Sequence, residues 1–171
     1  STDLHPSTAA RSVTRPATAE SAIAVGAVNR VDLDLAAFSS RGPTVDGRVK
    51  PDLVGPNGVS TSAISGFSGT SAAAPHAAGV AALVIDSVNG SIDHERLRRS
   101  LRESATRLAG DGPNNRTGYG LVNATGAVRA VGGTVGTPVL TVTDLRAPHT
   151  TTIGETIGVN ATITNTGDTV R

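Results

Sequence analysis

The stretch Gly69-Thr70-Ser71-Ala72-Ala73-Ala74-Pro75-His76-Ala77-Ala78-Gly79 decides the fold of this chain. Its serine follows a short run of small, flexible residues and precedes an almost wholly small, apolar helical pattern. This order predicts a central helix over 70–88, with Pro75 near its first turn and the Ser71 hydroxyl at the start of a buried helix. There the hydroxyl faces the positive end of the helix dipole and unpaired backbone N–H groups, the setting that a serine nucleophile in acyl transfer requires.

These eleven residues match the pattern Gly-Thr-Ser-x-Ala-x-Pro-His-x-Ala-Gly at every defined position, and they resemble the nucleophile motif of subtilisin-like serine proteases. Four further segments resemble that family in order and spacing, namely 21–28, 38–43, 50–56 and 118–124. The resemblance implies that Ser71 is the catalytic nucleophile and that its backbone N–H is an oxyanion donor. The expected fold class is α/β: the C-terminal part of a doubly wound, mostly parallel subtilisin-like sheet, then the first strands of a β-sandwich.

The resemblance also implies catalytic residues that this sequence lacks. The family's triad needs an Asp in an Asp-Ser/Thr-Gly setting and a His in a His-Gly-Thr setting, and its oxyanion hole needs an Asn in an Ala-Gly-Asn setting. None of these settings occurs here, and no histidine among His5, His76, His94 and His149 precedes Gly-Thr. We therefore expect an inactive chain that is part of a secreted serine endopeptidase. The alternative is a non-catalytic, subtilase-like binding or adhesion protein, which the missing residues favour.

Composition narrows the class of protein further. Hydrophobic residues make up 37% of the 171 positions, but aromatic residues make up only 2%, which predicts a core of closely packed small side chains. A formal charge of +1 makes no case for nucleic acid as a partner, and no apolar run is long enough for a membrane span. The resemblance implies protein or peptide substrates, an extracellular location and no required cofactor. The family often binds structural calcium, but no calcium ligand set is legible, and the oligomeric state stays open.

The pattern along the chain predicts its organisation. We expect a loop over 1–20, the C-terminal part of the catalytic domain over 21–131, a linker over 132–137, and the start of an immunoglobulin-like sandwich over 138–171. Within the catalytic part, the expected elements are a strand over 21–28, a brief strand at 53–54, and helices over 93–108 and 124–131. In the last segment, alternating residues predict strands at 140–143 and 157–164, followed by a turn at 165–168.

Several other polar residues invite a catalytic interpretation and have a plainer one. His76 points about 140° away from Ser71 around the helix, which favours a structural role. Thr70 is expected to cap the helix, and Asp52 to fix a loop. Asp32 and Asp34 form only a weak candidate for a cation site. The arginines of the second helix are expected to form a solvated face rather than a basic patch; they are Arg96, Arg98, Arg99 and Arg102.

Overall fold

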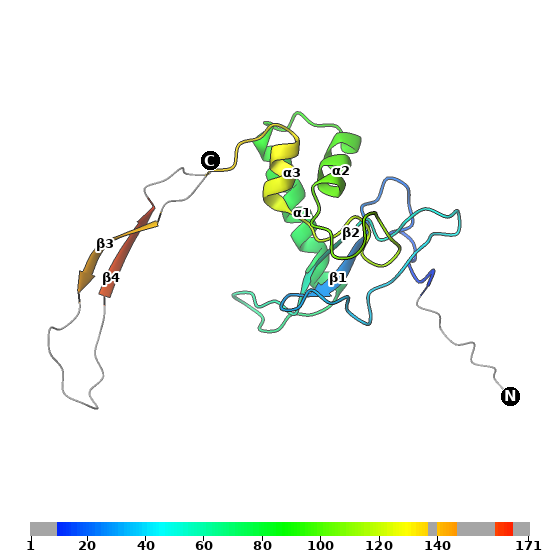
Figure 1. The fold of residues 1–171 in the computed structure, drawn as a ribbon, viewed down its shortest axis with the longest axis horizontal. Helices are drawn as coiled ribbons and strands as arrows, with labels where there is room; N and C mark the ends of the chain where they lie inside the picture. Colours follow the sequence, from blue (N-terminus) through cyan, green and yellow to red (C-terminus); the bar gives the residue numbers. More distant parts are fainter. Residues whose placement is uncertain (1–9, 137–139, 147–159, 166–171) are drawn as a thin grey trace, which may run out of the picture. The chain divides into compact units, whose positions relative to one another are not determined.

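The computed structural model describes residues 10–136, 140–146 and 160–165, which belong to two compact units, Ser1–Gly133 and Thr134–Arg171 (Figure 1). The first unit is α/β. Its elements are β1 (Val25–Asn29), β2 (Leu53–Asn57), α1 (Thr70–Ser87), α2 (His94–Glu103) and α3 (Ala124–Ala130). The second unit contains β3 (Leu140–Arg146) and β4 (Asn160–Asn165).

The sheet of the first unit is parallel, as the sequence predicts. β1 and β2 pair in register from Val25 opposite Leu53 to Asn29 opposite Asn57. On the other side of β2, the Val54 N–H donates to the carbonyl of Gly120 (2.9 Å), so a third segment flanks this strand. β2 is buried along nearly its whole length, which is the pattern of a strand covered on both faces. β1 begins four residues later than expected, and β2 is longer than the expected pair 53–54.

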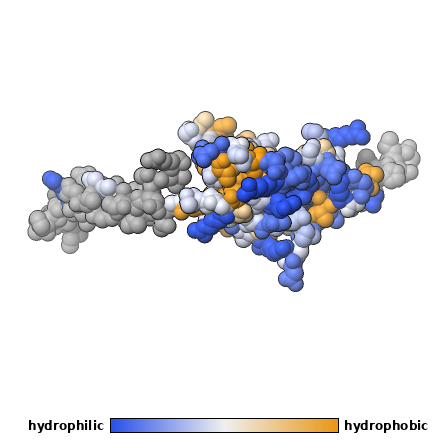
Figure 2. Space-filling model, turned by 90° about the horizontal axis from the view of Figure 1, so that it is seen from above, coloured by the Kyte–Doolittle hydropathy of each residue, from blue (hydrophilic) through white to orange (hydrophobic). Residues whose placement is uncertain are grey.

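Helix α1 packs against the sheet through small side chains, and helices α2 and α3 contact α1. The face toward the sheet is buried and is formed by Ala72, Ala73, Ala77, Val80 and Val84. The opposite face is exposed in this unit, so the helix is buried on one side only. That face includes Ala78 and Ala82, and Leu83 is 48% exposed. Figure 2 shows hydrophobic residues gathered on the face of the molecule that carries the helices.

The ends of α1 follow from a few residues. Pro75 is the sixth helical residue and lies inside the helix. The sequence pattern predicts it nearer to the first turn. Because proline has no N–H, the Ser71 carbonyl four residues earlier loses its usual helical partner. At the far end, Asn89 and Gly90 adopt left-handed conformations, and the Gly90 N–H donates to the Ile85 carbonyl (2.8 Å). Within the described ranges, no helix has the length and apolar character to cross a membrane.

Helix α2 is shorter than the predicted 93–108. It begins as expected, because Asp93 caps it by accepting a hydrogen bond from the Arg96 N–H (2.8 Å). It ends at Glu103 because Thr106 leaves the helix and exchanges two backbone hydrogen bonds of 2.8 Å with Leu121. Ala105 and Leu108 therefore lie outside the helix. α3 matches its predicted range to within one residue, with Asn123 as its cap.

The second unit is an antiparallel pair. β3 and β4 pair from Leu140 opposite Asn165 to Arg146 opposite Asn160, with an irregularity between Val142 and Asp144. Both strands overlap the segments predicted from alternation. The predicted strand residues 157–159 and turn residues 166–168 lie outside the described residues.

Candidate active site

Ser71 lies in the first turn of α1, beyond the carboxyl end of β2, and its side chain is exposed. The helix begins after Gly69, whose φ of 112° is accessible chiefly to glycine and which makes no side-chain cap. Thr70 is the first helical residue, so the expectation that its side chain caps the helix is wrong. The N–H groups of Ala72 and Ala73 both donate to the Gly69 carbonyl, at 3.0 and 3.3 Å.

The Ser71 N–H has no such partner. Neither this N–H nor the Ser71 hydroxyl donates a hydrogen bond to any residue that the structure describes. A free N–H at the positive end of a helix dipole is a donor for a negatively charged oxygen. The hydroxyl and the N–H of one residue thus lie together at an exposed helix start, which is the arrangement needed for attack on a carbonyl and for binding the resulting oxyanion.

The first turn of α1 is held by close backbone contact with β2. A Cβ placed on Gly55 would lie 2.5 Å from the carbonyl oxygen of Ala73, so only glycine lets the strand and helix approach this closely. The loop between β2 and α1 is closed by two backbone hydrogen bonds between Val59 and Phe67, of 3.0 and 2.6 Å. Ser71 therefore lies between two fixed features, the contact of Gly55 with Ala73 and the closed loop that precedes α1.

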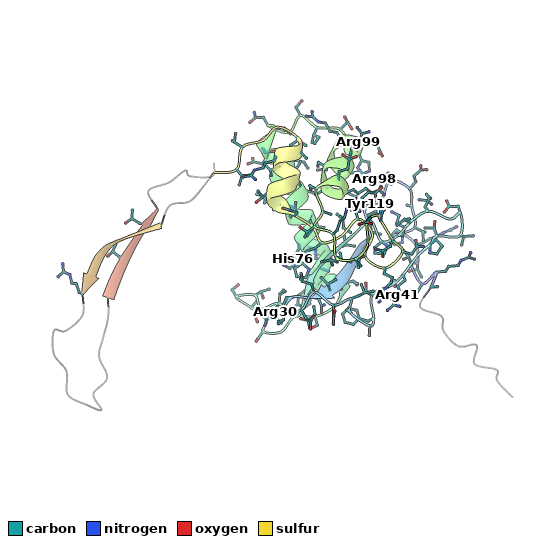
Figure 3. The ribbon with its side chains drawn as sticks, in the orientation of Figure 1. Arg30, Arg41, His76, Arg98, Arg99 and Tyr119 are labelled. Carbon is teal, nitrogen blue, oxygen red and sulfur yellow. The ribbon has the colours of Figure 1, made fainter. Side chains whose placement is uncertain are left out.

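His76, labelled on α1 in Figure 3, lies five residues after Ser71, which is more than one helical turn. Its Nδ1 atom lies 2.8 Å from the carbonyl oxygen of Ala72, within its own helix. A base must come within about 2.6–3.2 Å of the hydroxyl that it deprotonates. The structure shows no hydrogen bond between His76 and Ser71 among the described residues, and the imidazole is engaged with the helix backbone.

Asp52 is a buried carboxylate with three cationic side chains around it. Its side chain is 0% exposed and accepts hydrogen bonds from the Ala24 N–H and the Lys50 ammonium group, both at 2.7 Å. The Arg102 guanidinium binds the other carboxylate oxygen through Nε (2.9 Å) and also through Nη2. Arg98 Nε lies 4.0 Å from the same oxygen. Asp52 thus fixes a loop, as expected, but it also joins α2 to the sheet.

This cluster corrects the expectation of a solvated arginine face on α2. Arg98 and Arg102 are only 11% and 20% exposed, while Arg99 is exposed. In Figure 3, Arg98 and Tyr119 lie between α2 and the strands. The sequence did not predict this cluster because Asp52 and Arg102 are 50 residues apart. The available signal was the Lys50-Pro51-Asp52 triplet, since buried opposite charges occur as pairs.

The other acidic candidates, Asp32 and Asp34, lie in a turn, and a further aspartate, Asp46, forms a surface pair with Arg48. Asp32 accepts hydrogen bonds from the Asp34 N–H (3.0 Å) and the Asn29 side chain (3.4 Å), which accounts for the Asp-x-Asp spacing. In the described part of the chain, no three His, Asp, Glu or Cys residues are grouped to hold a metal. Hydrogen bonds from Arg48 and then from Thr44 lower the pKa of Asp46 to about 2.

Asp46 and Arg48 line a pocket of about 640 Å³. The Arg48 guanidinium also donates to the Thr18 carbonyl (3.0 Å), which joins the two segments that form the pocket walls. None of the lining residues belongs to α1 or to the loop before it. The lining residues are Arg15, Pro16, Thr18, Ala19, Thr44, Val45, Asp46 and Arg48.

Comparison with known proteins gives one consistent family. The model of the subtilase family, peptidase S8, matches residues 6–120. Bacillopeptidase F of Bacillus subtilis is 35% identical over 130 residues, covering 70% of this chain and 9% of that protein. Subtilisin Savinase of Lederbergia lenta is 38% identical over 120 residues, covering 70% of this chain and 42% of that protein. The chain therefore spans less than half the length of these relatives.

Solved structures agree with the sequence comparison. The CspB protease of Clostridium perfringens superposes with a TM-score of 0.61 at 35% identity, covering 70% of this chain and 29% of that one. Fervidolysin of Fervidobacterium pennivorans, described as a keratinolytic enzyme related to subtilisin, superposes with a TM-score of 0.55 at 21% identity. It covers 87% of this chain and 26% of its own, and at that identity it supports the fold alone.

Proposed function

This chain belongs to the subtilase family, and from that premise we propose that Ser71 is the nucleophile of a serine endopeptidase. The observation that carries the proposal is the first turn of α1. There an exposed hydroxyl and a free N–H belong to the same residue at the positive end of a helix. Ser68, three residues earlier, also has a hydroxyl, but that hydroxyl donates to the Gly66 carbonyl and lies before the helix.

In the proposed mechanism, the Ser71 oxygen attacks the carbonyl carbon of a peptide bond while a histidine takes the hydroxyl proton. The negative charge that develops on the carbonyl oxygen is met by the Ser71 N–H. The histidine returns the proton to the leaving amine, and water then hydrolyses the acyl-enzyme. This sequence contains no histidine, aspartate or asparagine in the settings that the family uses. The base, the residue that orients it and the second oxyanion donor would come from the part of the family domain that this chain does not match.

A chimera tests the proposal directly. The matching part of this chain would replace the corresponding 120 residues of subtilisin Savinase, so that the remainder of that subtilisin supplies the upstream groups. A fluorophosphonate should label Ser71, and Ser71→Ala should abolish both labelling and hydrolysis of a peptide anilide. Ser68→Ala is the matched control and should retain both. A folded chimera that is labelled elsewhere, or not at all, would overturn the assignment and favour the non-catalytic alternative.

The same premise supports the remaining features of the proposal. We expect the 171-residue chain alone to hydrolyse no peptide anilide, because a serine without its base is a weak nucleophile. We propose protein or peptide substrates, no required cofactor and an extracellular location. We also propose that β3 and β4 begin an immunoglobulin-like sandwich, because an isolated pair of strands is only marginally stable in water.

A further inference from the structure

Asp52 lies where four segments of the first unit meet. Its carboxylate binds the Ala24 N–H before β1, Lys50 in the preceding loop and Arg102 at the end of α2. Its backbone N–H donates to the Ala24 carbonyl, and its carbonyl accepts from the Tyr119 N–H, both at 2.8 Å. Side chain and backbone are therefore both fixed, and β2 begins at the next residue.

The strand that follows Asp52, β2, reaches the first turn of α1. Gly55 lies three residues after Asp52, about 10 Å along an extended strand. There the strand backbone touches Ala73, and a methyl group on Gly55 would meet the Ala73 carbonyl oxygen at 2.5 Å. Ala73 is two residues from Ser71 and shares the Gly69 carbonyl with Ala72. Because the backbones of β2 and α1 are already in close contact here, we expect a displacement of β2 to move the first turn of α1.

We propose that Asp52 is a positioning residue for Ser71. It touches neither Ser71 nor any group that would contact a substrate, and it acts through β2 and the contact between Gly55 and Ala73. The inference rests on the proposed role of Ser71 as nucleophile and extends it. Its physical basis is charge: Lys50, which is 1% exposed, and Arg102 both lose their carboxylate partner when Asp52 is neutralised. The start of β2 then loses the ionic contacts of its side chain and is held by its backbone hydrogen bonds alone.

The first test uses the full 171-residue chain and needs no catalytic activity. Backbone amide chemical shifts would be compared in the wild type, Asp52→Asn and Val128→Ala. Val128 is 7% exposed and lies in α3, so its truncation loosens the core away from β2. We expect Asp52→Asn to shift the amides of Ser71, Ala72 and Ala73, and we expect Val128→Ala to leave these three in place. Gly55→Ala, which presses on Ala73 directly, should shift the same three amides.

The second test measures the rate at which Ser71 reacts. In the Savinase chimera, Asp52→Asn should lower kcat by roughly 10²-fold, the loss that a displacement of about 1 Å of a reacting group causes, with KM unchanged. Asp52→Glu keeps the charge and should recover part of kcat. A merely structural role predicts less folded enzyme with unchanged kcat per labelled site. If Asp52→Asn does not fold, Arg102→Lys, which keeps the charge and loses the paired hydrogen bonds, takes its place in both tests.

The outcomes separate this inference from the proposed function. If Gly55→Ala shifts the first-turn amides and Asp52→Asn does not, Asp52 is not a positioning residue. The same conclusion follows if Asp52→Asn and Val128→Ala shift those amides equally, or if kcat is unchanged in the folded Asp52→Asn chimera. If the chimera shows no labelling of Ser71 in any form, the proposed function fails. The amide test then still decides whether Asp52 positions the first turn.

Discussion

Arg102 in helix α2 binds the carboxylate of Asp52, which lies 50 residues earlier in the sequence. Its Nε atom lies 2.9 Å from Asp52 Oδ1, and its guanidinium carbon lies 5.2 Å from the centre of the Tyr119 ring. The guanidinium is therefore held between a buried carboxylate and an aromatic face, two environments that suit its planar charge. Arg102 thus links helix α2 to the residue that directly precedes β2.

Replacing Arg102 by alanine should lower the free energy of unfolding by about 3 kcal/mol, because Asp52 would be left in the interior with Lys50 as its remaining strong cationic partner. Arg99→Ala is the matched control, since Arg99 belongs to the same helix and is exposed. It should change the free energy by no more than about 0.5 kcal/mol. Urea denaturation of the 171-residue chain measures both values. Equal effects of the two substitutions would mean that the buried pair adds no stability.

The contrast between these two arginines shows what the sequence could predict. The helical spacing of Leu97 and Leu101 placed α2 and its buried face, because that information is local. It did not show that Arg102 faces a carboxylate, because the partner is brought near only by the packing of α2 on the sheet. The predicted end of α2 was wrong because it too depends on a distant partner. Thr106 forms backbone hydrogen bonds with Leu121 and does not continue the helix.

The candidate site was more readable, because most of its geometry comes from one short stretch. Gly69, Ser71 and the small residues after them predicted an exposed hydroxyl at a helix start. The contact that holds this turn, between Gly55 and Ala73, was not readable, since a glycine in a strand has several explanations. What packs on the outer face of α1 was also not predictable, because an apolar periodic pattern does not say what covers it.

The pair formed by Asp46 and Arg48 predicts a response to acid. Asp46 has a pKa lowered from 3.8 to about 2, so its stabilising contribution is complete above about pH 4 and is lost as the pH falls through about 2. The midpoint of thermal unfolding of Asp46→Asn should lie below that of the wild type at pH 5, and the two should converge near pH 2. Asp111→Asn, at another exposed aspartate, is the control. A difference that stays constant from pH 5 to pH 2 would contradict the prediction.

His76 is expected to be dispensable for catalysis. Its Nδ1 atom is engaged with the Ala72 carbonyl at 2.8 Å, so its removal loses one local contact of about 1 kcal/mol. In the Savinase chimera, His76→Ala should keep fluorophosphonate labelling of Ser71, while Ser71→Ala removes it. Labelling per folded molecule is the quantity to compare, with folding followed by circular dichroism. Loss of labelling in a folded His76→Ala chimera would place this histidine in the reaction.

A charged substitution on the exposed face of α1 should be favourable in the 171-residue chain and harmful in the Savinase chimera. Ser71, Ala78 and Ala82 lie on one side of the helix, since steps of seven and four residues return to nearly the same direction. Ala82 is exposed in this chain and has apolar neighbours, among them Leu83. A contiguous apolar face of this kind favours association. Ala82→Glu should therefore reduce self-association of the 171-residue chain, measured by light scattering after size-exclusion chromatography.

In the chimera the same substitution should be harmful. If the remaining part of the subtilisin packs over this face, a glutamate at position 82 would be buried without a partner and would also overfill a site built for a methyl group. We expect Ala82→Glu to destabilise the chimera by more than about 3 kcal/mol. Val45→Glu is the control in both proteins, because Val45 is 95% exposed and lies far from α1 in sequence. A chimera that tolerates Ala82→Glu as well as Val45→Glu would show that this face stays open and that the group that activates Ser71 approaches from another side.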